Sequence, residues 1–362
     1  MNKVVYISIS LLLLISACKK DPSEDGVDRP YITTPYEMYI PSSLPPANFP
    51  DDNIPSVEGV ELGRMLFYDP ILSGDSTQSC ADCHNQEFAF TDNELALSVG
   101  IRGLEGGRNS MPIFNLMWHR DGFFWDGRAE LLRHQAVLPI QDELEMDETI
   151  GNLLAKLSEH PGYSTRFKQV FNVDEITEET VGLALEQFMM IIISGESKFD
   201  IGRTMQFSNF TPSEMRGLES FNAEAIENDS SNTGGDCFHC HGAPLFMIKG
   251  FMNNGLDTIF ADVGRAKVTG DKNDEGKFKV PSLRNIEKSG PYMHDGRFNT
   301  LDEVLEFYAN GAHFNSPNIN ANMHALQNPV YLSPQTRADL IAFMKTLTDN
   351  NYLNNEDYTN PF

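Results

Sequence analysis

The chain has 362 residues, a length that allows two domains of ordinary size. Its formal net charge of −25 argues against nucleic acid as a partner and favours a cationic protein partner, although solubility alone also accounts for such a charge. Four of its five cysteines lie in two copies of one short motif, and the fifth lies close to the N-terminus.

The first 17 residues have the pattern of a secretory signal. Lys3 is followed by an apolar run over residues 11–15, which is too short to span a bilayer as a mature helix. Ser16 and Ala17 then precede Cys18. This ending resembles a bacterial lipobox, so we expect cleavage before Cys18 and a lipid on that cysteine. An ordinary signal peptide with an incidental Cys18 is the alternative. The expected location is the periplasm or cell envelope, with the lipid anchoring the protein to the outer membrane.

The segment after the signal differs in composition from the rest of the chain. Residues 18–55 are rich in Pro, Asp, Ser and Asn, so we interpret them as a partly extended tether. A helix is predicted over residues 57–67, before Asp69 and Pro70. We expect an N-terminal domain over residues 56–205, a C-terminal domain over 206–350 and a loose polar tail over 351–362.

The repeated motif is C-x-x-C-H, the attachment signature of c-type haem. Its two copies supply the thiols of Cys80, Cys83, Cys237 and Cys240. Residues i and i+3 of a helical turn share a face, so both thiols of one copy can reach the two vinyl groups of one porphyrin. The next residue, His84 or His241, can then place an imidazole on the iron. The sequence therefore predicts two covalently bound c-type haems. A zinc-binding or dithiol module is the alternative use of these thiols.

Apolar residues recur at helical spacing through most of the remaining chain. The predicted helices cover residues 149–159, 162–171, 177–193, a segment that begins at 211, and 333–347. Thr211 with Pro212, and Ser333 with Pro334, each supply an N-cap and a first-turn proline. Few segments alternate as strands do, so the predicted fold class is mainly all-α with a minor sheet.

A further set of motifs extends from the first haem motif to beyond the second. They are Arg-Asn-Ser-Met-Pro at 108–112, Phe-Trp-Asp-Gly-Arg-Ala at 124–129, Gln-Ala-x-x-Pro at 135–139, Glu-Met at 145–146, Val-Pro-Ser-Leu-Arg-Asn at 280–285 and Pro-Tyr-Met-His-Asp-Gly-Arg at 291–297. In order and spacing they resemble the bacterial dihaem cytochrome c peroxidase and MauG superfamily. The resemblance covers nearly all of the chain after the tether. It implies two cytochrome c-like domains, each with one covalent haem.

The resemblance implies that hydrogen peroxide reacts at the N-terminal haem, on the face opposite His84. It assigns the pocket over that face to Gln135, Pro139 and Glu145. A carboxylate held there can move a proton between the two peroxide oxygens, and burial that lifts its pKa toward neutral makes it more efficient. An amide can hydrogen-bond peroxide without competing for iron. Without the resemblance, Glu145 is one residue of an acidic run that would ordinarily face solvent.

Trp125 matches the family tryptophan that lies between the two haems and relays electrons. An indole between two cofactors is an oxidisable stepping stone. The alternative is that Trp125 is a packing anchor, which is the more common role of tryptophan.

One position departs from the reductively activated members of the family. Those members carry a histidine in the Gly-rich loop that binds the iron of the first haem in the resting state, and this chain has Ile101 there. Isoleucine cannot bind iron, so we expect an open first haem that needs no reductive loop switch, as in MauG-like members. His119 could in principle substitute as a ligand.

The second haem takes His241 as its proximal ligand, and its sixth ligand decides its role. Family peroxidases use a methionine, whereas the matching residue here is Tyr308, as in MauG. A phenolate stabilises ferric iron relative to a thioether and should lower the potential. Tyr308 is therefore the predicted ligand, and Met293 and Met323 are the alternatives.

The family also holds a calcium ion between its domains. The resemblance places its ligands at the side-chain oxygen of Asn109 and the backbone carbonyls of Ser289 and Pro291. Oxygen ligands completed by water suit calcium. The alternative is that Asn109 only satisfies backbone groups of its loop.

The predicted function is reduction of hydrogen peroxide at the first haem, with electrons delivered through the second haem from a small cytochrome c or cupredoxin. A homodimer is a further expectation. A MauG-like oxidase, which uses peroxide-derived high-valent iron to oxidise a protein or an organic substrate, is the main alternative. A pure electron-transfer cytochrome is disfavoured because it would need a second protein ligand on the first haem.

Overall fold

The computed structural model describes residues 31–92, 95–119, 121–225, 234–326 and 332–362. Its helices are α1 (Val57–Tyr68), α2 (Cys80–Cys83), α3 (Leu132–Gln141), α4 (Ile150–Glu159), α5 (Pro161–Phe171), α6 (Glu178–Met190), α7 (Lys198–Thr204), α8 (Pro212–Asn222), α9 (Ala266–Thr269), α10 (Leu301–Glu306), α11 (Pro334–Lys345) and α12 (Asn350–Leu353). The strands β1 (Phe251–Met252) and β2 (Phe278–Lys279) pair antiparallel. The mainly helical fold class with a minor sheet is confirmed.

The N-terminal core forms where α1 and α3 pack against α6. Ser56 caps α1, and a capping box at Thr177 opens α6, so local sequence fixes where both helices begin. The contact between α1 and α6 is close, because a Cβ at Gly63 would overlap the carbonyl oxygen of Ala184. This compact base supports the first haem motif on α2, which also contacts α1.

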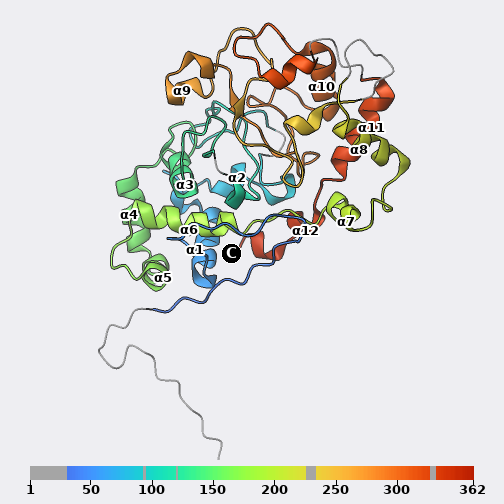
Figure 1. Cartoon of the computed structure of the whole chain (residues 1–362). Helices are drawn as coiled ribbons and strands as arrows, with labels where there is room; N and C mark the ends of the chain where they lie inside the picture. The colour runs from blue at the N-terminus through green and yellow to red at the C-terminus, as the bar shows by residue number, and fades with distance from the viewer. Residues whose placement is uncertain (1–30, 93–94, 120, 226–233, 327–331) are drawn as a thin grey trace, which may run out of the picture.

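The C-terminal core forms between α8 and α11, with α10 beside them. Four phenylalanines fill it, with ring centroids 4.9–6.3 Å apart: Phe199, Phe221, Phe246 and Phe343. The predicted caps at Thr211 and Ser333 are confirmed, since each side chain accepts a bond from its helix. In Figure 1 this core lies above α1, α5 and α6.

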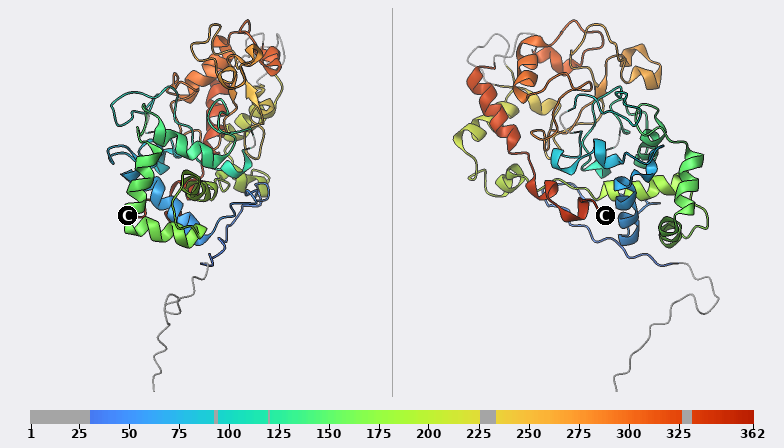
Figure 2. Two further views of the ribbon diagram at one scale, coloured as in Figure 1. Left: turned by 90° about the vertical axis from the view of Figure 1, so that its left-hand side faces the viewer. Right: turned by 180° about the vertical axis from the view of Figure 1, so that it is seen from behind.

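Both ends of the described chain pack against the N-terminal domain (Figures 1 and 2). The prediction of a loose tail after residue 350 is wrong, because Tyr352 and Tyr358 are buried in the N-terminal core. Residues 31–55 are extended as predicted, but the prediction that they form a flexible tether is wrong, because Leu44 is buried there and Asn53 bonds to Gln187 of α6 at 2.8 Å. The signal segment, Cys18 and residues 19–30 of the tether lie outside the described residues.

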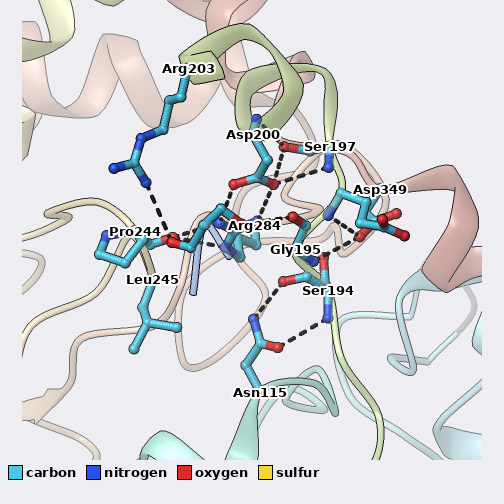
Figure 3. Close-up of polar contacts among 12 residues, drawn as sticks. Asn115, Ser194, Gly195, Ser197, Asp200, Arg203, Pro244, Leu245, Arg284 and Asp349 are labelled. Carbon is cyan, nitrogen blue, oxygen red and sulfur yellow. Dashed lines mark hydrogen bonds and ion pairs between the residues drawn. The ribbon is translucent and has the colours of Figure 1, made fainter. Parts of the chain in front are cut away.

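A buried polar cluster ties together segments that are distant in sequence (Figure 3). Arg284 is fully buried and forms two 2.8 Å bonds with the carboxylate of Asp200. Nearby, the side chain of Asn115 bonds to the backbone of Ser194, and Asp349 accepts from the backbone N–H of Gly195. The cluster therefore joins the N-terminal domain, the connection after α6 and the C-terminal domain. Among the described residues, no helix combines the length and apolar character needed to cross a membrane.

Candidate functional site

The first C-x-x-C-H motif forms the short helix α2. Ser79 caps this helix, and its N–H and hydroxyl both donate to the carboxylate of Asp82, at 2.6 and 2.7 Å. Burial raises the pKa values of Cys80 and Cys83 to about 12. Both thiols are therefore protonated and apolar in character, and they lie one helical turn apart as thioether attachment requires.

His84 follows α2, and its ring is fixed from one side. Its Nδ1 lies 2.7 Å from the carbonyl oxygen of Phe90, which it reaches as a donor in the Nδ1–H tautomer. Burial lowers the pKa of His84, so the imidazole is neutral. A neutral ring that donates through Nδ1 keeps Nε2 as the atom available to a metal.

Glu145 lies on the turn after α3. Burial raises its pKa to about 7, Asp142 adds to this shift, and Arg128 opposes it. The charge of Glu145 also contributes to the raised pKa values of both Cys80 and Cys83. The structure therefore brings this carboxylate close to the first haem motif, instead of leaving it on a solvated acidic face.

Gln135 and Pro139 lie on α3, half-buried and four residues apart. Residues at this spacing share one face of a helix. The carbonyl oxygen of Pro139 accepts from the N–H of Met146 at 3.3 Å, which joins this face to the turn that carries Glu145. The three residues assigned to the distal pocket are thus grouped, and their catalytic roles remain predictions.

The loop that contains Ile101 is fastened to the same turn. The N–H of Ile101 donates to the carbonyl oxygen of Glu145 at 2.9 Å, and Arg102 pairs with the carboxylate of Asp147. Gly100 is required because any Cβ there would overlap the carbonyl oxygens of Leu144 and Glu145. The alternative ligand His119 instead places Nδ1 3.1 Å from Nζ of Lys279.

Trp125 lies at the boundary of the two domains. Its indole N–H donates to the carbonyl oxygen of Asn109 at 2.9 Å, and its own carbonyl accepts from the N–H of Lys279 at 2.8 Å. Trp125 also lines the cavity that contains the second haem motif. Its place in the wall of this cavity is compatible with either a relay or a packing role.

The second motif opens into a large, mostly apolar cavity lined by Cys237, Cys240 and His241. Burial lowers the pKa of His241 to about 4, and its Nδ1 lies 3.2 Å from the carbonyl oxygen of Pro281. This imidazole is therefore neutral and oriented in the same way as that of His84. A neutral histidine at the wall of an apolar cavity, beside two thiols, fits the proximal side of a haem.

Tyr308, Met293 and Met323 line this cavity as well. The amide of Asn254 lies 3.2 Å from the hydroxyl of Tyr308 and 3.8 Å from the sulfur of Met293, so these two candidate ligands are neighbours. Tyr308 lies in a π-helical turn (Phe307–Gly311), a distortion that is frequent at functional sites. Burial raises its pKa to about 12.

Comparison with known proteins identifies the family. A family model described as di-haem cytochrome c peroxidase matches residues 57–205. The methylamine utilization protein MauG of Methylorubrum extorquens is 34% identical over 310 residues, which cover 85% of this chain and 82% of MauG. The cytochrome c551 peroxidase of Nitrosomonas europaea is 32% identical over 320 residues, covering 86% of this chain and 87% of that protein. The chain belongs to the di-haem cytochrome c peroxidase and MauG family.

Solved structures agree with this assignment. The crystal structure of a MauG-like protein associated with microbial copper homeostasis is 31% identical, has a TM-score of 0.78, and covers 90% of this chain and 99% of its own. The diheme peroxidase BthA from Burkholderia thailandensis is 22% identical with a TM-score of 0.73, covering 88% and 90% of the two chains, and supports the fold alone.

As a member of this di-haem family, the protein carries two c-type haems. The side chains fit them, because each motif offers two unpaired thiols one turn apart and a half-buried, neutral histidine. Among the described cysteines none is in a disulfide.

The three residues assigned to calcium line the cavity of the second motif. The amide nitrogen of Asn109 donates to the carbonyl oxygen of Ala96 at 3.1 Å, so a cation would have to use the amide oxygen. Ser289 is buried, and Pro291 lies two residues further along the same loop. Calcium remains a proposal for this family member.

Two features of the site were missed from sequence. Lys279 is buried at the domain boundary, where its Nζ contacts His119 and the carbonyl oxygen of Gly122, and burial lowers its pKa to about 8. The only available signal was a lysine directly before the family run at 280–285.

His239, between the cysteines of the second motif, hydrogen-bonds Asp236 at 2.7 Å. With Glu224 these form, in the described part of the chain, a group that could hold a metal ion.

Proposed function

We propose that this protein reduces hydrogen peroxide to water at its N-terminal haem, with electrons that arrive through the C-terminal haem. One peroxide takes two electrons and two protons and leaves as two molecules of water. The haem iron, once bound at His84, supplies the redox chemistry of O–O cleavage. The observation that carries the proposal is the position of Glu145, a half-buried carboxylate whose pKa burial raises to about 7 and whose charge acts on both thiols of the first motif.

Each pocket residue has a task that its chemistry allows. Glu145 accepts a proton from one peroxide oxygen and returns it to the oxygen that leaves, which is most efficient when its pKa is near the working pH. Gln135 donates a hydrogen bond to peroxide and orients it. Pro139 shapes the wall and adds no competing ligand. Ile101 keeps the iron face open to substrate, because its side chain has no ligand atom.

Electrons are proposed to enter at the second haem and to pass Trp125, whose indole donates to the carbonyl oxygen of Asn109 and lines the cavity of the second motif. The donor is a small cytochrome c or cupredoxin, attracted by the net charge of −25. We further propose lipid attachment at Cys18, location in the bacterial cell envelope, a calcium ion at Asn109, Ser289 and Pro291, and a homodimer.

The test is a stopped-flow and EPR measurement on the diferric protein mixed with one equivalent of peroxide, with and without reduced cytochrome c. The proposal expects a high-spin ferric signal, a fast peroxide-driven spectral change without prior reduction, and rapid return when the donor is present. Two low-spin haems that ignore peroxide until half-reduced would contradict the open first haem.

A MauG-like oxidase is the second candidate. Tyr308 favours it, because a phenolate ligand would hold the second haem oxidised and send oxidising equivalents to an organic or protein substrate. The same experiment separates the two, since an oxidised state that persists for minutes and is not discharged by cytochrome c favours the oxidase.

A further inference from the structure

The C-terminal segment places two tyrosines inside the N-terminal domain. Tyr352 and Tyr358 retain only 2% and 6% of their exposure and pack in the core beside the first haem motif. They come from a chain end whose composition gave no reason to expect burial. In the proposed function, electrons reach the first haem by a different route, through Trp125.

Aromatic rings connect the first motif to these tyrosines. The ring of His84 hydrogen-bonds the backbone of Phe90 at 2.7 Å. The Phe90 ring lies 5.9 Å from that of Tyr352, and the Tyr352 ring lies 6.3 Å from that of Tyr358. The chain of contacts therefore starts at the proximal histidine of the first motif and continues within the N-terminal core.

The chain of rings ends in a polar pocket at the surface. Tyr352 and Tyr358 line this pocket together with Tyr36 and Tyr39, which come from the extended N-terminal segment. Burial raises the pKa of Tyr358 to about 12, and the nearby Tyr36 phenol adds to this shift. Tyr36 is half-buried and Tyr39 is 72% exposed, so the last members of the series reach solvent.

Two carboxylates, Asp349 and Asp357, line the pocket together with the tyrosines of the series. The hydroxyl of Tyr352 donates to the carbonyl oxygen of Ile113 at 3.1 Å, and that of Tyr358 donates to the carbonyl oxygen of Ile191 at 3.0 Å. A backbone carbonyl cannot take up a proton at neutral pH, so oxidation of either buried phenol requires its proton to pass to a carboxylate. After burial, Asp349 helps to raise the pKa of Tyr352, and Asp357 helps to raise the pKa of Tyr358. Asp357 also helps to raise the pKa of Tyr36, after burial, so this one carboxylate acts on both outer phenols of the series.

The pocket has the charge of a cation site. Its rim carries the carboxylates of Glu37, Glu196 and Asp357, and none of the described residues that line it is lysine or arginine. Tyrosine rings beside carboxylates favour an aromatic cation, through both charge and cation–π attraction. An anionic donor of the same size would be repelled.

We propose that Tyr352, Tyr358 and Tyr36 relay oxidising equivalents from the first haem to this pocket, where a small aromatic amine is oxidised. The inference rests on the proposed reaction of peroxide at the first haem and adds a second outlet, used when the donor of the second haem is absent. Two molecules of a protonated aromatic diamine each lose one electron and one proton and leave as radical cations. The peroxide takes up two electrons and two protons and leaves as two molecules of water.

The test uses the full-length di-haem protein with peroxide and p-phenylenediamine at mildly acidic pH. Tyr352→Phe and Tyr36→Phe keep the ring and remove the redox-active hydroxyl. We expect each to lower kcat/KM for the diamine about tenfold, equivalent to about 1.36 kcal/mol in the barrier. The matched control is Tyr163→Phe. Tyr163 is another buried tyrosine of the same domain, and its hydroxyl donates to Asp69. This variant should oxidise the diamine at the rate of the parent protein. The anionic dye ABTS should respond weakly to all three changes.

A second readout follows the radical itself. Peroxide added without any donor should leave a spin-trap adduct on the peptide that contains Tyr36, and Tyr352→Phe should abolish this adduct. An adduct that forms equally in Tyr352→Phe, or diamine oxidation unchanged in both variants, overturns the relay. Peroxide turnover with reduced cytochrome c should be the same in the parent protein and in all three variants. If the parent protein itself lacks this activity, the proposed function is refuted instead.

Discussion

The backbone N–H of Ile101 donates a 2.9 Å hydrogen bond to the carbonyl oxygen of Glu145. By the resemblance, Ile101 occupies the position at which reductively activated relatives carry an iron ligand. It is thus attached to Glu145, the residue proposed to move protons. Arg102 strengthens this attachment through Asp147, and Gly100 permits it by lacking a Cβ. The loop and the pocket turn therefore form one unit, and the proposed function expects this unit to leave the first haem accessible.

Ile101→His tests whether the missing ligand alone explains the open haem. We expect a low-spin fraction to appear in the EPR spectrum of the diferric protein. Competition by the imidazole for the iron, worth about 1.4 kcal/mol, should slow the reaction with peroxide about tenfold. Ile101→Leu is the control and should remain high-spin. If Ile101→His also remains high-spin, the hydrogen bond to Glu145 and the Arg102 pair hold the loop too firmly for residue 101 to reach the iron.

Glu145→Gln removes the proton acceptor and keeps the volume of the side chain. We expect the rate of reaction with peroxide to fall by about 10²-fold or more, as is typical when a general base is lost. Glu143→Gln, on the same turn but exposed, should change the rate little. Stopped-flow absorbance at the Soret band measures both. Equal rates in the two variants would remove Glu145 from the mechanism.

The pH dependence follows from the environment of Glu145. Burial raises its pKa to about 7, so the carboxylate that accepts the peroxide proton is present above pH 7 and lost below it. The rate of reaction with peroxide should therefore rise with pH through a midpoint near 7 in the parent protein. Glu145→Gln should lack this rise. A parent profile that is flat between pH 5 and 8 would show that burial of Glu145 does not control the reaction.

The two tryptophans offer a matched pair of variants. Trp125 and Trp118 are both buried, and each indole N–H donates to a backbone carbonyl at 2.9 Å. We expect Trp125→Phe to slow electron transfer between the haems about tenfold, or 1.36 kcal/mol in the barrier, because the oxidisable indole is lost from the boundary. Trp118→Phe should not. Rapid-mixing optical spectroscopy of the half-reduced protein resolves the two haems, and equal effects would mean that Trp125 acts through packing.

Features set by neighbouring residues could be predicted from the sequence, and features set by distant ones could not. The capping box at Thr211 and the C-x-x-C-H turns are fixed within a few residues, and their helices begin as predicted. The contact of Lys279 with His119 joins residues 160 positions apart. The predicted helix over 177–193 ends at Met190 in the structure, because Ile191 and Ile193 instead bond to the hydroxyl of Tyr358.

The candidate site divides in the same way. The thiols and proximal histidines follow from one motif, whose spacing alone dictates the chemistry. The grouping of Gln135, Pro139 and Glu145 was expected only from the resemblance, since an acidic run gives no local sign of burial. Burial of Tyr352 and Tyr358 had no local signal, because it depends on a pocket that the rest of the chain builds.

Tyr308→Met tests the sixth ligand of the second haem. A thioether in place of a phenolate favours ferrous iron, so the potential of that haem should rise by on the order of 100 mV, within the ≈ 0.8 V that axial ligands span. Tyr292→Phe is the control, since Tyr292 lines the same cavity while its hydroxyl bonds to the backbone of Ile286. Spectroelectrochemical titration measures both potentials. An unchanged potential in Tyr308→Met would point to the neighbouring Met293 as the existing ligand.

The ion pair of Arg284 and Asp200 makes a prediction about stability. Arg284 is fully buried, and its guanidinium bonds to Asp200 and to the carbonyl oxygen of Pro244. Asp200→Ala leaves a buried charge without its counter-ion, so the free energy of unfolding should fall by about 3–5 kcal/mol. Lys345→Gln breaks the half-exposed pair with Glu287 and should cost about 0–1 kcal/mol. Guanidinium denaturation of the di-haem protein, followed by tryptophan fluorescence and Soret absorbance, compares the two. Equal losses would show that the cluster in Figure 3 contributes no more than a surface contact.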